Sequence, residues 1–139
     1  MSKDKQNRSS GRRVKRNGRS KENKRHVRFH YWMMNSDAFR SLSPFEARLL
    51  LELYGLYNGR NNGYFFLSCR EAARRCNMGK NTANRAFKAL IDMGFIRRRA
   101  DEPEQYNLRE ANYWILTEFE FGTQPASKAF MRWQPEQNS

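Results

Sequence analysis

The sequence is poor in residues that could make a disulfide or a metal site. It contains two cysteines and two histidines in 139 residues. Cys69 and Cys76 fall on one predicted helix, about 10 Å apart at ~1.5 Å rise per residue, whereas a disulfide needs Cα atoms within about 7 Å. A zinc site takes about four ligands, and the other candidates, His26 and His30, lie at the N-terminal end. We expect no disulfide, no metal and no cofactor.

Several other features are missing. No apolar run approaches the ~18 residues of a membrane span, and no apolar signal core follows the N-terminal charges. No Gly-rich phosphate loop is present, because Gly55, Gly59 and Gly63 fall at a helix end and in a turn. No Ser or Cys has a neighbouring base, and the acidic residues are scattered. The sequence therefore predicts a cytoplasmic, nucleoid-associated protein that is not an enzyme and has no membrane partner.

Acidic residues are few, and basic residues are concentrated at one end. Lys and Arg number 27 against 14 Asp and Glu, which gives a net charge of +13 and a pI near 10.3. Such a surplus favours a polyanionic partner, either nucleic acid or an acidic membrane surface. Residues 1–26 hold 11 basic and two acidic residues, a net charge of +9, and the remaining 113 residues carry +4.

Residues 1–26 are also nearly free of apolar side chains. Besides Met1, Val14 is their one aliphatic residue, so the segment cannot bury enough surface to offset the entropy of ordering. We predict a disordered basic arm over 1–26 and a folded domain over 27–139. The arm is either a solubilising tail or a binder of DNA phosphates, with the contacts assigned to Arg12, Arg13, Lys15 and Arg16.

The first part of the domain begins with aromatic residues and continues into helices. Residues 28–34 read as an extended, partly buried lead-in, and 36–41 as a short helix capped by Ser36 or Asn35. Ser43 and Glu46 form a capping box around Pro44, which suits the first helical position. That helix should run to Asn58-Gly59 with one broad buried stripe: positions 45, 49, 50, 53, 54, 56 and 57.

Shorter elements follow in an order that identifies the fold class. Residues 64–67 read as a small strand, and Ser68 with Glu71 as a second capping box that opens a helix through about Cys76. Residues 77–79 form a turn, and a helix over about 80–93 stops at Gly94. Strands over 95–99 and 112–117 flank a loop at 101–111, and a short helix is expected within 126–133 of the aromatic C-terminal tail. We predict a mainly α domain with a small β-hairpin, a winged helix-turn-helix.

The most informative pattern is the pair of helices around the 77–79 turn. Two helices joined by a short turn containing Gly form a DNA-binding helix-turn-helix. Ala72 and Ala73 supply small residues where the helices cross, and Met78 can plug the turn. In the second helix an apolar face follows the 3.6-residue period: Ala83, Ala86, Phe87, Leu90 and Ile91.

The opposite face of the 80–93 helix carries donor-rich side chains and no acid before Asp92. Arg can bond guanine bidentately and Asn can do so with adenine, so we expect this face to enter the major groove as a recognition helix. An ordinary solvated helix face is the alternative, although such faces usually mix charge signs. The base-reading candidates are Lys80, Asn81, Asn84, Arg85 and Lys88.

Phosphate contacts are predicted around this helix. The Ser68 end of the preceding helix offers backbone N–H groups to an anion. Arg70, Arg74 and Arg75 could add contacts, although pairing with Glu71 would occupy some of them. The wing tip, with Asp101, Glu102 and Glu104, should stay off the DNA. The assigned phosphate contacts of the domain are Ser68, Arg70, Arg74, Thr82, Arg97, Arg98, Arg99 and Arg109.

Residues 68–96 also resemble winged helix-turn-helix regulators of the MarR and GntR type. The matching positions are Gly79, Thr82, Arg85, Leu90, Gly94, Phe95 and Ile96. The wider stretch is similar to small helix-turn-helix proteins of bacterial chromosomes, plasmids and phages, and to the N-terminal domain of phage replication-initiation proteins. The resemblance implies duplex DNA binding in a bacterial or phage setting. Asn77 departs from it, since many such turns have Gly there, and Gly79 replaces the common Ser cap.

Three functions remain open from the sequence. Transcriptional regulation by sequence-specific binding to double-stranded DNA is the first. Replication initiation or origin binding on a plasmid or phage is the second, and non-specific architectural or RNA binding is the third. Reading an operator with one small domain usually needs a homodimer. Tail aromatics could form that interface or cover the domain's own core: Phe119, Phe121, Phe130 and Trp133.

Overall fold

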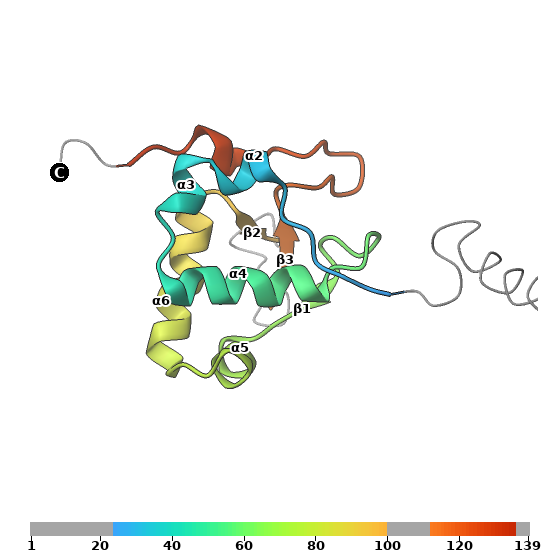
Figure 1. The fold of residues 1–139 in the computed structure, drawn as a ribbon. Coiled ribbons are helices and arrows are strands. Elements are labelled where there is room, and N and C mark those ends of the chain that lie inside the picture. The colour runs from blue at the N-terminus through green and yellow to red at the C-terminus, as the bar shows by residue number, and fades with distance from the viewer. Residues whose placement is uncertain (1–23, 100–111, 136–139) are drawn as a thin grey trace, which may run out of the picture.

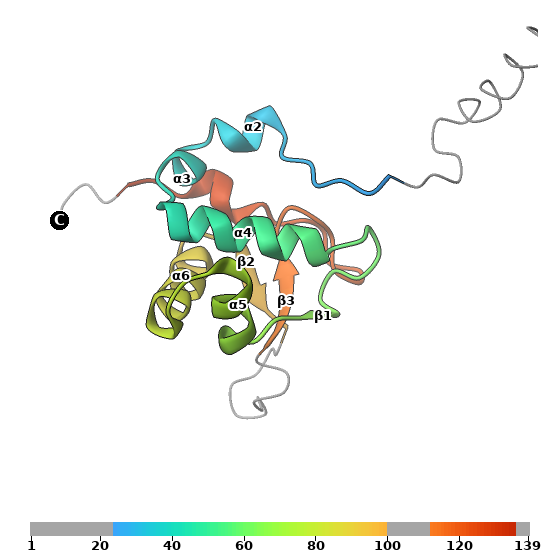
Figure 2. The same cartoon turned by 60° about the horizontal axis from the view of Figure 1, so that its bottom comes forward.

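The computed structural model describes residues 24–99 and 112–135. Most of the predicted arm, with Arg12, Arg13, Lys15 and Arg16, lies outside these residues, as do the predicted 101–111 loop and Arg109. Figures 1 and 2 show the arrangement of the elements. In chain order they are α2 (Tyr31–Met34), α3 (Asp37–Arg40), α4 (Pro44–Leu56), β1 (Phe65–Phe66), α5 (Cys69–Cys76), α6 (Lys80–Asp92), β2 (Ile96–Arg98), β3 (Tyr113–Leu116) and the 3₁₀ helix η3 (Ala129–Arg132).

Helix α4 is fixed at both ends by polar side chains. At its start the Ser43 hydroxyl accepts from the Glu46 N–H, and the Glu46 carboxylate accepts from the Ser43 N–H, so the predicted capping box is confirmed. Its end comes at Leu56, two residues before the predicted Asn58. The Asn61 side chain explains this, because its Nδ2 donates to the Leu56 carbonyl at 3.0 Å.

The buried stripe of α4 is narrower than the sequence predicted. Leu49, Leu50, Leu53 and Tyr54 are buried, whereas Phe45 is 51% exposed. The buried positions begin one turn into the helix, so the apolar period extends further along the sequence than the packing does. The prediction that Phe45 belongs to the core was wrong.

The predicted extended lead-in over 28–34 was wrong for residues 31–34, which form one helical turn, α2, whereas His30 before it is extended. The N–H groups of Met33 and Met34 both donate to the His30 carbonyl, at 3.1 and 3.0 Å. This turn drives Met33 into the core and leaves Tyr31 exposed. The short helix α3 follows as predicted, with the Ser36 hydroxyl accepting from the Phe39 N–H.

Three short strands form one antiparallel sheet in the order β1-β3-β2. Phe65 pairs with Trp114 and Phe66 with Tyr113, while Arg98 pairs with Trp114 from the other side. Because successive side chains of a strand point to opposite faces, Phe65 and Trp114 enter the core together. The short strand β1 thus joins the predicted β2–β3 hairpin as a third strand.

Trp114 ties the sheet to α6. Its ring is 2% exposed and stacks on Phe87 of α6, with centroids 4.8 Å apart and planes 12° from parallel. Its Nε1 donates to the Leu67 carbonyl at 3.0 Å. One side chain therefore fixes the position of α6 relative to β3 and to the start of α5.

The Asn62 side chain forms hydrogen bonds with the backbone at the end of β3 and just after it. Its Oδ1 accepts from the Leu116 N–H at 2.7 Å, and its Nδ2 donates to the Leu116 and Glu120 carbonyls, each at 3.0 Å. The residue is 6% exposed, so water cannot readily replace these bonds. Asn62 is therefore a structural residue of the turn that precedes β1.

We expect Asn62→Ala to lower the free energy of unfolding by about 1–3 kcal/mol, because it leaves buried backbone groups without partners. Chemical denaturation followed by circular dichroism measures this loss. The matched control is Asn58→Ala four residues earlier, where the side chain is exposed and the loss should stay within about 0.5 kcal/mol. Equal losses in the two variants would contradict the role assigned to Asn62.

The C-terminal tail covers the core rather than standing free. Phe130 of η3 is 1% exposed and stacks on Phe95 at 4.8 Å, while Phe119 and Trp133 pack against the core cluster. Figure 1 shows η3 lying with α2 and α3 at one end of the molecule. The predicted tail helix is a 3₁₀ turn and is shorter than 126–133. Of the two roles left open for these aromatics, the described structure uses Phe119, Phe130 and Trp133 in the core.

Gly94 makes the contact between α6 and this tail. Its φ is +91°, which glycine adopts without strain, and a Cβ here would lie 2.8 Å from the backbone of Ala129 and Phe130. The Thr117 hydroxyl donates to the Gly94 carbonyl at 2.6 Å. Glycine thus ends α6, as predicted, and also lets η3 approach.

One buried acid is satisfied within the core. The Tyr54 hydroxyl donates to Oε1 of Glu118, whose Oε2 lies 3.7 Å from Nε2 of His30. Burial and the adjacent carboxylate raise the pKa of Tyr54 above its usual range, so its phenol stays protonated and remains the donor.

Helices packed on a small three-stranded sheet, with a helix-turn-helix at α5–α6, make the domain a winged helix-turn-helix, as predicted.

Candidate nucleic-acid interface

The turn between α5 and α6 adopts the geometry that sets two helices of a helix-turn-helix at an angle. Asn77 has φ 57° and ψ 52°, in the left-handed region that Asn tolerates better than most residues. The Met78 N–H donates to the Ala73 carbonyl at 3.0 Å, and the Met78 side chain packs against the core as predicted. Asn77 therefore serves where similar turns have Gly.

Helix α6 has two distinct faces. Ala83, Ala86, Phe87 and Leu90 are buried, as predicted, and Ile91 is half-buried. The five base-reading candidates are all exposed, and they occupy the first two and a half turns of the helix: Lys80, Asn81, Asn84, Arg85 and Lys88. The structure thus brings the whole predicted set onto one open surface of donors, while the half-buried Thr82 lies at its border.

Helix α5 presents its N-terminus beside this surface. The Ser68 hydroxyl accepts from the Glu71 N–H at 3.1 Å. The second half of the predicted capping box does not form, because the Glu71 carboxylate turns to two arginines instead of to the Ser68 N–H. The Ser68 hydroxyl proton and the first N–H groups of α5 remain suited to a phosphate, and Arg70 is exposed.

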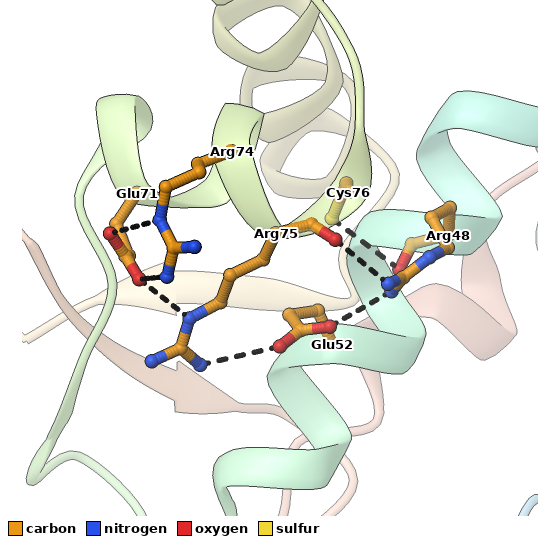
Figure 3. A network of polar contacts seen from close by, with 6 residues as sticks. All are labelled: Arg48, Glu52, Glu71, Arg74, Arg75 and Cys76. Atoms are coloured by element: carbon orange, nitrogen blue, oxygen red, sulfur yellow. Dashed lines mark hydrogen bonds and ion pairs between the residues drawn. The ribbon is translucent and has the colours of Figure 1, made fainter.

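Arg74 and Arg75 both pair with Glu71 (Figure 3). The Glu71 carboxylate accepts from Nη2 of Arg74 at 2.5 Å and from Nε of Arg75 at 2.9 Å. The Arg74 side chain is 71% exposed and that of Arg75 is 35% exposed. Arg74, a predicted phosphate contact, therefore lies on the surface with its charge partly neutralised, which is the alternative that the sequence left open.

The same network fastens α5 to α4. Arg48 donates to the Arg75 carbonyl at 3.0 Å and to Glu52 at 2.9 Å, and Nη1 of Arg75 lies 3.3 Å from Glu52. Figure 3 shows Glu52 between the two guanidinium groups. Sequence reasoning did not find this link, although the i, i+4 spacing of Arg48 and Glu52 is its local signal. The link orients α5 and, through the turn, α6.

We expect the Glu71 carboxyl to titrate with a pKa of about 2, because hydrogen bonds from Arg74 and then Arg75 favour its ionised form. The pairing is then complete above the ordinary Glu value and is lost only as the pH falls through about 2. Carboxyl carbon NMR across an acid titration measures this midpoint. In the Arg74→Ala, Arg75→Ala double variant the midpoint should rise toward the ordinary value, and an unchanged midpoint would contradict the assignment.

The three wing arginines lie over aromatic rings of the sheet. The Arg98 guanidinium is 5.0 Å from the Trp114 ring centroid, and that of Arg99 is 5.0 Å from Tyr64 and 5.1 Å from Tyr113. Arg97 lies 5.9 Å from the Phe121 centroid and donates to Gln124 at 2.5 Å. The structure thus gives each of these predicted phosphate contacts a ring contact that sequence reasoning missed, and Arg98 lies over the ring that stacks on Phe87 of α6.

The described residues offer neither a metal-binding cluster nor a helix that could span a membrane. No group of three or more His, Cys, Asp or Glu side chains among residues 24–99 and 112–135 could hold a metal ion. Within the same ranges no helix is long and apolar enough to cross a membrane. Both cysteines are free thiols, and burial raises the pKa of the Cys76 thiol.

Comparison with known protein families identifies part of the chain. Residues 40–96, from the end of α3 to the start of β2, match a family described as a helix-turn-helix domain. Comparisons with curated proteins and with solved structures found no match. The matched segment contains both helices of the turn and the exposed α6 surface. The chain therefore carries a helix-turn-helix domain, and DNA is the partner to which this class of domain points.

Proposed function

We propose that the protein is a transcriptional regulator that reads duplex DNA with the exposed face of α6 in the major groove. The observation that carries the proposal is that this helix has one buried apolar face and one exposed face of hydrogen-bond donors. Its buried face is locked against Trp114 and α4, while its open face holds two Lys, two Asn and one Arg. These are the side-chain types that bond base edges and phosphates.

Contacts to the DNA phosphates beside α6 would set the register of the helix on the duplex. They would come from the Ser68 end of α5, from Arg70 and from Thr82. The basic arm would add phosphate contacts that raise affinity in a salt-dependent way. We propose that the arm supplies affinity and that α6 supplies sequence preference.

We also propose that the protein acts by binding rather than by catalysis, in the cytoplasm on the nucleoid. Burial keeps the Cys76 thiol protonated, and His30 is placed beside Glu118 rather than beside a nucleophile. A homodimer on an inverted repeat would extend the recognised site, since one recognition helix covers only a few base pairs.

The test is a binding selection with the full-length protein on fragmented genomic and random duplex DNA, followed by sequencing of the retained molecules. A defined motif supports the proposal, and an inverted repeat within it indicates two copies of the chain. Retention without any motif would instead indicate a non-specific architectural or RNA-binding protein. The location of the sites, at promoters or in tandem at an origin, separates regulation from replication initiation.

A further inference from the structure

The outer face of the small sheet carries rings and guanidinium groups instead of the usual mixed polar side chains. We call it the aromatic–arginine face and define it by Tyr64, Phe66, Arg97, Arg99, Tyr113 and Phe121. Strand alternation turns Phe66 and Tyr113 away from the core, because their neighbours Phe65 and Trp114 point inward. By the same alternation Arg97 and Arg99 lie on the face opposite Arg98.

The members of this face touch one another in a continuous series. Phe66 meets Tyr113 edge-on, with centroids 5.5 Å apart. Arg99 lies between the rings of Tyr113 and Tyr64, and Tyr64 contacts Phe121 at 5.9 Å. The Arg99 N–H also donates to the Tyr113 carbonyl at 3.1 Å, which fixes the backbone beneath the guanidinium.

Two of the rings remain open to solvent. Tyr64 is 61% exposed and Phe66 is 47% exposed. Exposing two large rings, one just before the edge strand β1 and one within it, is costly to a small domain, which has few apolar residues to spare. Rings left open in this way are available to stack on a flat partner.

The Phe121 ring at the end of the series is held in place by a glycine. A Cβ on Gly63 would lie 2.3 Å from Cε1 of Phe121, so only glycine leaves room for the ring there. Gly63 also has φ +88°. Arg97 then lies over the Phe121 ring and is held by Gln124, so the geometry of this end is preset.

We propose that the aromatic–arginine face binds an unpaired DNA strand, with bases stacked on Tyr64 and Phe66 and phosphates bound by Arg97 and Arg99. Every base has a flat face that stacks on an aromatic ring, and single-strand binders combine such rings with positive charge along the backbone path. Both charged members of the face are arginines, which complements a polyanion. A guanidinium has five N–H donors, and one that lies over a ring can still donate from its edge to phosphate oxygens, although Arg97 uses one of its donors on Gln124.

This site is separate from the duplex-reading surface. Figures 1 and 2 both place β1 and α6 on different sides of the molecule. A protein with both surfaces could hold a duplex and, beside it, a strand released where that duplex opens. The face would then serve either a regulator at a melted promoter or an origin-binding protein.

The experiment compares the full-length protein and its variants on a fluorescein-labelled single strand of mixed DNA sequence and on the duplex of the same sequence, by fluorescence anisotropy. We expect the Tyr64→Ala, Phe66→Ala double variant to bind the single strand at least tenfold more weakly and the duplex within about twofold of wild type. The matched control removes a Tyr and a Phe of similar exposure elsewhere, Tyr31→Ala with Phe45→Ala, and should change neither affinity.

Two further variants keep the test decisive. Arg99→Gln, which leaves all the rings in place, should also weaken single-strand binding, and Tyr64→Phe, which keeps a stacking ring, should preserve it. Single-strand affinity that is unchanged in the double variant and in Arg99→Gln would overturn the proposal. An equal loss of affinity for the single strand and for the duplex in the Tyr64→Ala, Phe66→Ala variant would also overturn it. So would tenfold tighter binding of an RNA strand of the same sequence by the wild-type protein. Because duplex binding is measured separately, this proposal can fail while the proposed function stands.

Discussion

Replacing Arg85 with alanine should weaken binding to the preferred duplex by about 1–3 kcal/mol, roughly five- to 150-fold, and relax selectivity at one base pair. Arg85 lies in the middle of the exposed face of α6 and is itself exposed, so its removal costs little stability. Its guanidinium offers the two parallel donors that match the O6 and N7 atoms of guanine. Anisotropy on the selected site and on single-base variants of it measures both effects.

The control for this variant is Arg132→Ala, which removes the same charge from η3, beyond the C-terminal end of α6 (Figure 1). Arg132 is exposed and donates to the Ser127 carbonyl at 3.3 Å. We expect its loss to change affinity by less than about twofold, the size of a general charge effect. If the two variants behave alike, the contribution of Arg85 is electrostatic only, and base reading must lie elsewhere.

Replacing Trp114 with alanine should lower the free energy of unfolding by about 3–5 kcal/mol, because it leaves a large cavity beside Phe87. The change also leaves the Leu67 carbonyl without its indole donor. A loss of this size is a large part of the stability of a small domain, so the variant should be partly unfolded at 37 °C. Urea denaturation followed by circular dichroism measures the loss.

The matched control is Trp32→Ala, at a tryptophan that is 40% exposed and lies near Phe130 at 6.1 Å. We expect a smaller loss there, about 1 kcal/mol, since exposed rings contribute less burial. In the cold, where Trp114→Ala is still folded in part, its duplex affinity should fall in proportion to the folded fraction. Losses of equal size in the two variants would contradict the placement of Trp114 as the link between the sheet and α6.

The sequence predicted the helix-turn-helix well because its signals are local. The apolar period of Ala83, Ala86, Phe87 and Leu90 gives the phase of α6 directly, and the exposed donors follow from that phase. Ser43 and Gly94 mark helix ends by their own chemistry. Each of these features depends on residues within one or two turns, which is the range over which periodicity and capping rules apply.

The predictions from sequence were wrong or incomplete where contacts between distant residues determine burial and local conformation. Phe45 fits the apolar period of α4 but lies one turn before the buried positions begin. The aromatic-rich start of the domain favours an extended lead-in over 28–34, yet Met33 enters the core because the chain turns there. The Asn62 bonds to Leu116 and the Arg99 contacts with Tyr64 and Tyr113 join residues 54, 35 and 14 positions apart. Spacing within one sequence does not reveal such pairs.

At Glu71 the prediction from sequence was limited because one carboxylate had two possible sets of hydrogen-bond partners. The Ser-x-x-Glu pattern at Ser68 correctly predicted the helix start and the Ser68 cap. The carboxylate had two competing uses, and charge-assisted bonds to Arg74 and Arg75 are stronger than a bond to a neutral backbone N–H. The sequence contained both alternatives, and relative bond strength decided between them.

The most direct test of the central claim, that α6 reads bases in the major groove, uses the selected duplex with single purines replaced by their 7-deaza analogues. Each analogue removes the N7 acceptor from the major groove and leaves base pairing intact. We predict that at least one 7-deazaguanine weakens binding of the wild-type protein about tenfold and does not weaken binding of Arg85→Ala further. Wild-type affinity that is unchanged at every substituted purine would contradict the claim.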